Sequence, residues 1–382
     1  MSDVPHLRFP EFSGEWEKCK VSDLLDFYST NSLSWEQLEY DTNAMMNLHY
    51  GLIHVGLPTM VDLAKDKLPN IKEDNMPKNF VLCKEGDVAF ADASEDTNEV
   101  AKTIEFYNLA GTNVVCGLHT IHGRDNKHKT VVGFKGYAFS STAFHNQIRR
   151  IAQGTKIYSI STKNFSECYI GLPSKPEQTK IATLLRLIDE RIATQNKIIE
   201  KLQSLIKGIA QNIVLLNKPN VCISQCLECS SSTLQESDVL EYGTYPVYGA
   251  NGIVGYLDNY NTQSEAIYII KDGSGVGAVS YVTGKCSATG TLNILQTKEG
   301  FSLQYLYYLL KVFNYEPYKT GMAIPHIYFK DYGKAKIFCP SYPEQLRYAN
   351  LLSTIDCKLL AEQNILSNLS VQKQYLLRQM FI

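Results

Sequence analysis

The stretch LPSKPEQTKIATLLRLIDERIATQNKIIEKLQSLIKGIAQNIV at residues 172–214 decides the fold, because the chain contains it twice. The second copy, CPSYPEQLRYANLLSTIDCKLLAEQNILSNLSVQKQYLLRQMF, lies 167 residues further on, and the two copies align without a gap. Between Pro173 and Asp189, 10 of 17 positions hold the same residue in both copies. We conclude that the chain is an internal duplication.

Each copy predicts one long helix with a clear start. Ser174 and Ser341 are suitable N-caps, Pro176 and Pro343 suit the first helical position, and a glutamate follows each serine by three residues, as in a capping box. From the first proline to residue 214, such a helix would be about 58 Å long. The sequence therefore predicts two rods that could hold other parts of the chain apart.

Apolar residues then recur at alternating steps of four and three, which is the pattern of a coiled-coil seam. One polar residue interrupts the seam at the same place in each copy, and such a residue commonly fixes register or orientation. The predicted seam residues are Leu185, Ile188, Ile192, Gln195, Ile199 and Leu202 in the first copy and Leu352, Ile355, Leu359, Glu362, Leu366 and Leu369 in the second.

The composition is that of a globular protein with two or more cores: 382 residues, 44% hydrophobic and 20% charged. No apolar run approaches the roughly 18 residues of a membrane span, and the first residues lack the apolar core of a signal peptide. We therefore expect a cytoplasmic protein without membrane contact, in which the ten scattered cysteines are free thiols.

Charge is unevenly distributed although the net charge is only −2. Residues 123–150 contain six lysines and arginines against the single acid Asp125. A local basic face of this kind can bind DNA within a nearly neutral protein.

The repeat extends upstream of the helices, since Gly154, Ile157 and Ile160 recur at the same offset as Gly321, Ile324 and Ile327. Each half is thus a variable α/β body followed by a shared closing strand and helix. We predict a first body at residues 1–171, a first helix at 172–216, a second body at 217–338 and a second helix at 339–382.

Local patterns give a coarse outline of both bodies. In the first body we expect a strand passing into a helical turn at 16–28, a polar, turn-rich stretch at 31–79, a strand pair at 80–91, one strand at 114–121 and a helix at 140–151. The second body is rich in tyrosine and glycine, which predicts short strands joined by glycine turns.

Several stretches together resemble the specificity (S) subunit of Type I restriction-modification systems, over nearly the whole chain. They are LRFPEFSGEWEK at 7–18, the two PSxPEQ helix starts, GLHT at 117–120, YPVYGANGIVGY at 245–256 and GSGVG at 273–277. One PEQ start is a weak signal, but two copies behind dissimilar bodies are a specific one.

The resemblance implies an α+β fold, with two α/β target recognition domains separated by two long repeated helices packed as an antiparallel coiled coil. It implies that each domain reads one part of an asymmetric bipartite site on double-stranded DNA. It also implies that the chain is not an enzyme by itself and scaffolds two methyltransferase (M) subunits and the restriction (R) subunits. S-adenosylmethionine, ATP and Mg would then belong to those partners, and this chain would hold no cofactor or metal.

Candidate DNA-contacting residues follow from side-chain chemistry, because Lys and Arg attract phosphates while His, Asn and Tyr can reach base edges. For the four histidines His119, His122, His128 and His145 we favour DNA contact over a metal site, since no tight carboxylate pairing accompanies them. The candidates are His119, His122, Arg124, Lys127, Lys129, Lys135, Arg149 and Arg150 in the first body and Tyr248, Asn251, Lys271, Ser274, Lys319 and His326 in the second.

Three motifs have a functional and a structural interpretation. Cys222, Cys226 and Cys229 have the C-x3-C-x2-C spacing of an iron–sulfur ligand set, but we favour an entry segment equivalent to residues 21–25. The glycines at 273–277 could cradle a phosphate, but we favour a hairpin turn. We interpret Asp189 and Asp356 as surface or packing residues of the helices.

Two other classes of protein stay open. One is an enzyme, either a methyltransferase with its own recognition domain or a metal-cluster enzyme, which would bind S-adenosylmethionine as an isolated chain. The sequence contains neither the Asn/Asp-Pro-Pro-aromatic motif of amino-methyltransferases nor a helicase phosphate loop. The other class is a coiled-coil adaptor without DNA binding, which salt-sensitive binding to duplex DNA would exclude.

Overall fold

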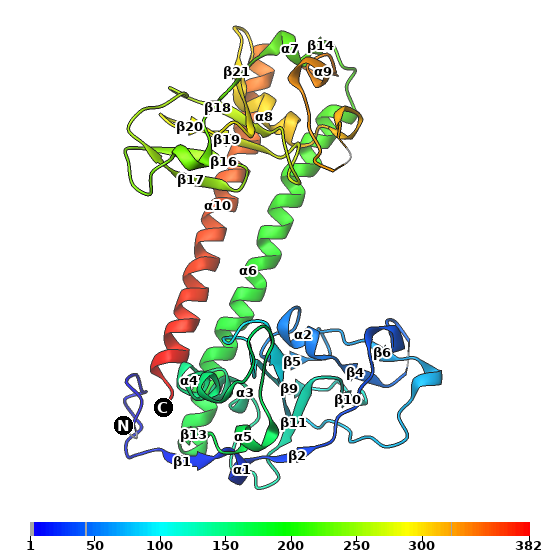
Figure 1. The fold of residues 1–382 in the computed structure, drawn as a ribbon, viewed down its shortest axis with the longest axis vertical. Coiled ribbons are helices and arrows are strands. Elements are labelled where there is room, and N and C mark those ends of the chain that lie inside the picture. The colour runs from blue at the N-terminus through cyan, green and yellow to red at the C-terminus, as the bar shows by residue number, and fades with distance from the viewer. Residues whose placement is uncertain (1–3, 43, 322) are drawn as a thin grey trace. The chain divides into compact units, whose positions relative to one another are not determined.

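The computed structural model describes residues 4–42, 44–321 and 323–382, so the first three residues of the predicted lead-in lie outside the described ranges. The chain forms two compact units, one of residues 1–194 and 365–382 and the other of residues 195–364. Each unit combines one variable body with part of both repeated helices (Figure 1).

The two repeated helices are α6 (Lys175–Leu215) and α10 (Tyr342–Gln379). Each begins directly after the predicted cap serine, so each proline occupies the second helical position rather than the predicted first. This position is equally favourable, because the first four N–H groups of a helix have no intrahelical partner. In α10 the glutamate half of the capping box is present, since Glu344 Oε2 accepts from the backbone N–H of Ser341 at 3.3 Å.

The seam pattern agrees with the burial of the helices. None of the twelve predicted seam side chains is exposed: seven are buried, and Ile192, Leu202, Ile355, Leu366 and Leu369 are half-buried. In the first unit the beginning of α6 shares a core with Leu376, Leu377 and Met380 at the end of α10, and in the second unit Gln195 of α6 contacts Glu362 of α10. The two helices are therefore antiparallel.

The first unit contains a five-stranded sheet of order β2-β11-β7-β9-β5, in which only the β5–β9 pair is parallel. Its strands are β2 (Asp26–Tyr28), β11 (Thr120–Arg124), β7 (Val88–Ala91), β9 (Thr103–Asn108) and β5 (Met60–Asp62). A second sheet of order β10-β4-β6-β3 contains β10 (Val114–Cys116), β4 (Met46–Leu48), β6 (Asn70–Ile71) and β3 (Leu38–Glu39).

Two short strand pairs and several short helices complete the first unit. The pairs are β1 (Glu17–Lys20) with β13 (Tyr169–Leu172), and β8 (Ala93–Ser94) with β12 (Tyr158–Ser159). The α-helices are α1 (Val21–Leu24), α2 (Tyr50–His54), α3 (Lys135–Phe139), α4 (Thr142–Ile151) and α5 (Thr162–Ser166), and the 3-10 turns are η1 (Trp35–Gln37) and η2 (Glu73–Asn75).

Two strand predictions for the first body are corrected. Residues 114–121 form two strands, β10 and the start of β11, because a turn at Gly117 to His119 reverses the chain. Residues 80–91 contain only one strand of a pair, β7, and Leu82 instead bridges to Val115. The strand and helical turn at 16–28 and the helix at 140–151 are confirmed.

The second unit is built around an antiparallel sheet of order β15-β21-β18-β19, formed by β15 (Leu227–Ser231), β21 (Leu292–Thr297), β18 (Ala266–Ile270) and β19 (Val279–Val282). A smaller sheet contains β17 (Gly252–Leu257), β16 (Tyr245–Gly249) and β20 (Ser287–Ala288), and a short pair joins β14 (Val221–Cys222) to β22 (Lys336–Ile337). The helices are α7 (Ile223–Cys226), α8 (Leu303–Lys311) and α9 (Phe329–Tyr332), with 3-10 turns η3 (Glu236–Asp238) and η4 (Glu316–Tyr318).

The two units share a frame and differ in what is added to it. The entry strand and helical turn β1–α1 correspond to β14–α7, and the closing strands β13 and β22 pair with those entry strands. The antiparallel order β2-β11-β7-β9 matches β15-β21-β18-β19. The four-stranded sheet belongs to the first unit and the sheet around β16 to the second, which explains why only the frame is visible as a sequence repeat.

Repeated polar residues tie each body to its helix. Gln178 donates to Pro173 O and accepts from Val131 N, whereas Gln345 donates to Pro340 O and accepts from Ser302 N, all at 2.9 Å. Because these partners are backbone atoms, the same glutamine can anchor bodies of different sequence.

The repeated aspartates make a second matched contact. The hydroxyl of Tyr137 donates to Asp189 at 2.9 Å, and that of Tyr308 donates to Asp356 at 3.1 Å. Both aspartates are thus packing residues of the helices, as predicted. Among the helices in the described ranges, none is long and apolar enough to cross a membrane.

Candidate nucleic-acid interface

The basic run at 123–150 does not form one charged face. Three of its six cations pair with acids outside the run: Arg124 with Asp87, Lys129 with Glu17 and Lys135 with Glu105. These acids lie far away in the sequence, and strand pairing brings them close. Much of the local excess of positive charge that the sequence suggests is therefore neutralised within the unit.

The predicted DNA contacts of His122 and Lys135 are wrong, because both side chains are buried. His122 is fully buried in β11, and its Nε2 lies 2.7 Å from Asp87 Oδ2. Lys135 is buried at the start of α3, with Nζ 3.2 Å from Glu105 Oε1. Buried polar and charged groups need such partners, so these two side chains are held in the core and do not reach DNA.

Arg124 is held beside this histidine. Its guanidinium donates to both carboxylate oxygens of Asp87, at 2.8 and 2.7 Å, and to Leu82 O at 2.8 Å. It also lies 4.7 Å from the centre of the Tyr28 ring. Burial alone would raise the pKa of Asp87, but the hydrogen bonds from Arg124 and then His122 together outweigh it, so this pKa lies below its ordinary value. Arg124 thus acts mainly as a fixed partner of Asp87.

The other candidates of the run are at least partly accessible. Lys127 is exposed and donates to Asp23 O at 2.8 Å, while Lys129 is half-buried against Glu17. Arg149 and Arg150 are exposed in the last turn of α4. Contact of these four side chains with DNA stays a prediction.

His119 belongs to a row of aromatic rings that the sequence did not reveal. Ring centres of Trp35 and His49 lie 4.4 Å apart, those of His49 and Tyr50 4.7 Å, and those of Tyr50 and His119 5.2 Å. Trp35 is 45% exposed and His119 is exposed. Burial, and then the neighbouring His119, lowers the pKa of His49, so this ring is neutral at pH 7. The row offers flat faces and ring edges on the first unit.

In the second unit the loop 271–278 joins β18 to β19, which confirms the hairpin interpretation of the glycine-rich motif. Gly277 has φ +90°, and a Cβ there would lie 3.0 Å from the ring of Tyr315, so glycine is required. The loop lies against residues 325–327, because Gly273 N donates to Pro325 O at 3.0 Å and Ile327 N to Lys271 O at 2.9 Å. Three predicted residues, Lys271, Ser274 and His326, thereby belong to one region.

The remaining candidates of the second unit have different surroundings. Asn251 is exposed at the turn between β16 and β17, and Tyr248 is half-buried against Tyr268, where burial raises its pKa. Lys319 Nζ lies 2.5 Å from Glu316. All three stay predictions as DNA contacts.

Each unit presents a partly exposed histidine whose Nδ1 faces an aspartate: His119 with Asp92 at 3.1 Å, and His326 with Asp272 at 2.6 Å. The two aspartates follow β7 and β18, which are equivalent strands of the shared frame. An acid one or two residues after a buried strand was the available sequence signal for both. Such pairing fixes the orientation of each ring.

The cysteine motif of the second unit is structural. Cys226 is buried, with its sulfur 3.9 Å from that of Cys339, and Cys222 is the N-cap of α7 in the predicted entry segment. Within the described residues, Cys222, Cys226 and Cys229 do not form a group that could share a metal ion. This finding disfavours the iron–sulfur interpretation.

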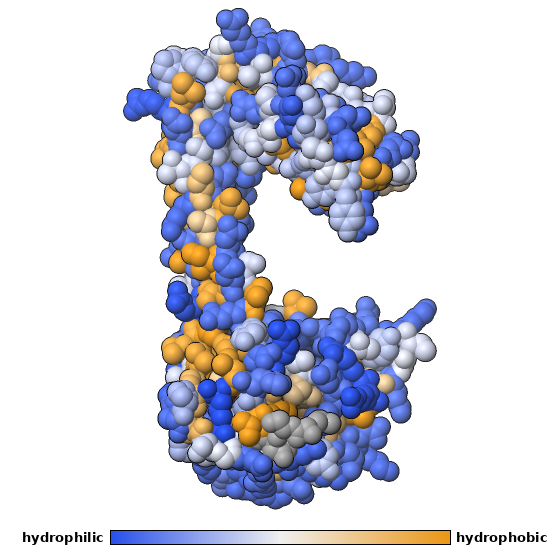
Figure 2. Space-filling view, turned by 90° about the vertical axis from the view of Figure 1, so that its left-hand side faces the viewer, coloured by the Kyte–Doolittle hydropathy of each residue, from blue (hydrophilic) through white to orange (hydrophobic). Residues whose placement is uncertain are grey.

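The outer faces of the helices carry exposed apolar side chains, visible as orange surface in Figure 2. Ile198 on α6 is 37% exposed and Ile365 on α10 is 41% exposed, and these two residues occupy the same position of the repeat. The exposed apolar residues of the helices also include Leu187, Leu205, Leu346, Leu351, Leu360, Val371 and Tyr375.

Two variable bodies on one duplicated strand–helix frame define the class of the protein. A family model described as Type I restriction modification DNA specificity domain matches residues 14–204 and 221–370. The chain belongs to this family.

The similar proteins with curated names match over shorter segments. The chain is 27% identical over 112 residues to the Type I restriction enzyme EcoprrI specificity subunit of Escherichia coli, covering 29% of this chain and 28% of that protein. It is 30% identical over 82 residues to the putative type I restriction enzyme specificity subunit S.HindORF215P of Haemophilus influenzae, covering 21% of each. The matches thus span less than a third of either relative.

Solved structures resemble the whole chain. The S subunit of a Type-I restriction-modification system from M. genitalium gives a TM-score of 0.65 at 19% identity, over 99% of both chains. A chain from a study of complex assembly and conformational transition of the type I R-M system gives 0.55 at 14% identity, over 95% of this chain and 96% of that one. At these identities the likeness establishes the fold.

Proposed function

We propose that this chain is the specificity subunit of a type I restriction-modification complex and reads an asymmetric, bipartite target on double-stranded DNA. The observation that carries the proposal is a shared frame with unlike surfaces, the aromatic row on the first unit and the loop 271–278 on the second. Different surfaces on one frame select different half-sites. The family membership supports DNA as the ligand.

Within this proposal, cations position the protein and ring edges read sequence. Lys127, Arg149 and Arg150 are exposed and suit phosphate contacts. His119 and His326 are our candidates for base contacts, because an aspartate fixes each ring and an oriented imidazole can bond to a base edge in the major groove.

The helices would set the separation of the half-sites. α6 runs without interruption from one unit into the other, and α10 returns antiparallel to it. Because half-site spacing follows from protein geometry, we expect one fixed spacer length in the target.

We further propose that two methyltransferase (M) subunits dock on the exposed apolar faces of the helices. Contiguous exposed apolar surface marks interaction sites, and the repeat supplies the exposed isoleucine twice, as Ile198 and Ile365. The restriction (R) subunit would join the assembled complex. Catalysis, and with it S-adenosylmethionine, ATP and Mg, would belong to these partners.

Co-expression with a candidate methyltransferase, followed by mapping of methylated adenines, tests the function directly. We expect one split, asymmetric motif with a constant gap. The variant carrying Ile198→Glu and Ile365→Glu should keep salt-sensitive binding to duplex DNA and lose the methyltransferase, which separates recognition from assembly.

Three outcomes would count against the proposal. A palindromic motif would contradict two unlike reading surfaces. Absence of salt-sensitive DNA binding would favour a protein adaptor. Binding of S-adenosylmethionine by the isolated chain would favour an enzyme.

A further inference from the structure

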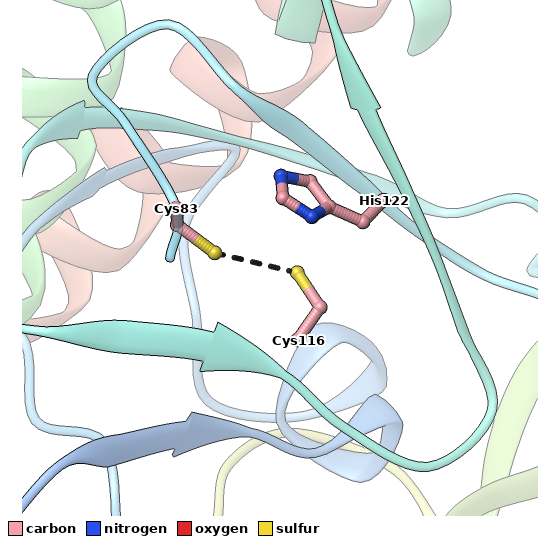
Figure 3. Close-up of side chains that lie close together, drawn as sticks. All are labelled: Cys83, Cys116 and His122. Atoms are coloured by element: carbon pink, nitrogen blue, oxygen red, sulfur yellow. Dashed lines mark hydrogen bonds between the residues drawn. The ribbon is translucent and has the colours of Figure 1, made fainter. Parts of the chain in front are cut away.

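The core of the first unit contains a cluster of metal-binding side chains that DNA recognition does not require. Cys83, Cys116 and His122 are all buried, and one ligand atom from each lies within 4.8 Å of the others (Figure 3). The two sulfur atoms are 3.6 Å apart. A tetrahedral ion bound to two thiolates at about 2.3 Å would hold its sulfurs about 3.8 Å apart, so the observed spacing is close to that of a metal site.

Strands from both sheets of the first unit hold the three residues in place. Cys116 ends β10 and His122 lies within β11, while Cys83 is attached to β10 because its backbone N donates to Val114 O at 2.8 Å. The neighbouring Leu82 also bridges to Val115. Ligands carried by paired strands are preorganised, which lowers the cost of binding an ion.

The histidine carries the strongest sign of a missing ligand. Its Nε2 is engaged by Asp87 at 2.7 Å, whereas its Nδ1 is buried and has no hydrogen-bond partner. In Figure 3 the ring lies beside the two sulfur atoms. An unpaired buried nitrogen costs about 1–3 kcal/mol, and coordination of an ion would remove that cost.

The second shell fits the same interpretation. Metal-bound histidines commonly donate their other ring N–H to a carboxylate, which fixes the tautomer and makes the ligand more basic. Asp87 occupies that position, and Arg124 holds it through both carboxylate oxygens. Asp87 and Arg124 neutralise each other, and two thiolates would neutralise a divalent ion, so the loaded core would carry no net charge.

We propose that Cys83, Cys116 and His122 bind a thiophilic divalent metal ion, with zinc as the ion of choice, and that this ion stabilises the first unit. Two thiolates and an imidazole suit zinc, and a water molecule would fill the fourth position that these three residues leave. We assign the ion a structural role because all three residues are buried in the core. The alternative is a pair of core thiols in a weak hydrogen bond beside an unsatisfied histidine. This inference does not rest on the proposed DNA recognition.

Metal content of the full-length chain tests the proposal. The protein is purified under reducing conditions, stripped with a chelator, reconstituted with Zn²⁺ or Co²⁺ and passed through gel filtration. We expect one ion per chain, and for Co²⁺ a thiolate-to-metal charge-transfer band in the near ultraviolet. Zinc should also raise the melting temperature of the stripped protein.

A second buried cysteine pair in the same chain, Cys226 and Cys339, serves as the control. Cys83→Ser and Cys116→Ser should abolish the cobalt band, whereas Cys226→Ser and Cys339→Ser should keep it, because that second buried thiol pair is part of no metal-binding group within the described residues. Loss of the band in the Cys226 or Cys339 variants alone, or no retained ion in the unmodified chain, would overturn the proposal.

A second measurement needs no variant, so it tests the proposal even if the cysteine variants do not fold. X-ray absorption at the zinc edge of the unmodified protein should show two sulfur ligands and at least one nitrogen. A first shell without sulfur would overturn the proposal even if every cysteine variant aggregates.

Discussion

The beginnings of α6 and α10 carry the same Pro-Glu-Gln, yet the glutamates have opposite surroundings. Glu177 is buried, where it accepts from Arg8 Nε at 2.7 Å and Arg8 Nη2 at 2.8 Å, and from Trp16 Nε1 at 3.3 Å. Glu344 is exposed and caps its own helix through Ser341. The glutamate at this position of the repeat is therefore a buried hydrogen-bond acceptor in the first unit. In the second unit it stabilises only the start of its own helix.

The adjoining glutamines do not diverge in this way, because Gln178 and Gln345 bond to backbone atoms in both units. A contact to the backbone survives when the sequence of the body changes. A contact to a side chain, such as that of Glu177 with Arg8, requires a particular partner, and the lead-in provides it only once. The two glutamines therefore hold body and helix together in both units, whereas the buried contact of Glu177 is specific to the first unit.

The largest difference between the halves should come from removing the two glutamates. Glu177→Ala leaves Arg8 and Trp16 without their acceptor and should destabilise the first unit by about 3 kcal/mol. Glu344→Ala removes an exposed cap and should cost about 1 kcal/mol or less. Urea unfolding of both variants measures the difference, and equal losses would contradict the assigned roles.

The two aspartate-paired histidines should act on separate half-sites. His119→Ala should relax the first part of the recognised motif and His326→Ala the second, each by about 1–3 kcal/mol in discrimination, or roughly 5- to 150-fold in affinity for the cognate bases. Binding to libraries randomised in one half-site at a time measures this. A uniform loss across both halves would show that the histidines position the chain without reading sequence.

The stability of the helix pair around Gln195 and Glu362 should change with pH in opposite directions in the original chain and in the Gln195→Glu variant. Hydrogen bonds from Lys358 and then Gln195 lower the pKa of Glu362, so its contribution to stability is present above pH 4.3, the approximate unfolded value, and is lost as pH falls through the folded pKa. Gln195→Glu would place two carboxylates together and should lower the denaturation midpoint at pH 7, because two like charges repel.

Lowering the pH towards 5 should partly restore that variant, because one of the two facing carboxylates becomes protonated. Denaturation midpoints at pH 5 and pH 7 check the sign for both forms, and Gln195→Met is the uncharged control. Parallel pH profiles for the original chain and the glutamate variant would contradict the proposed contact.

The smallest expected difference concerns the two aspartates. Asp189 accepts from Tyr137 and also lies 2.6 Å from Lys373, whereas the position equivalent to Lys373 in the other copy is the buried Ile206. Asp189→Asn should therefore cost about 1 kcal/mol and Asp356→Asn about half of that. Thermal unfolding of the two variants ranks them, and the reverse order would show that Lys373 contributes nothing.

The helices were predictable because their contacts follow from local periodicity. The step pattern from Leu185 to Leu202 assigned the seam, and the Ser-x-x-Glu spacing assigned the starts to within one residue. A separate match of residues 223–227 to residues 21–25 also predicted that the entry segment α7 is equivalent to α1. Such features depend on neighbours in the sequence, which one chain displays directly.

The candidate interface was predicted less well, because partners distant in the sequence decide which charges remain accessible. Asp87 bonds to His122 and Arg124, which lie 35 and 37 residues further along the chain. Glu105 forms a buried ion pair with Lys135. The ring row from Trp35 to His119 escaped prediction for the same reason, since Trp35 and Tyr50 lie in a stretch without strand or helix periodicity. Burial of single polar residues depends on strand register, which composition does not reveal.

The contact of Gln195 with Glu362 has one further consequence, because the two residues occupy the same position of the repeat. The two copies of the repeated helix therefore contact each other at equivalent positions and are related by a local two-fold axis. A half-length protein with only one helix copy could pair with a second molecule of itself, placing glutamine opposite glutamine in one case and glutamate opposite glutamate in the other. The glutamine half should form such a homodimer at neutral pH, whereas electrostatic repulsion should keep the glutamate half monomeric until the solution is acidified.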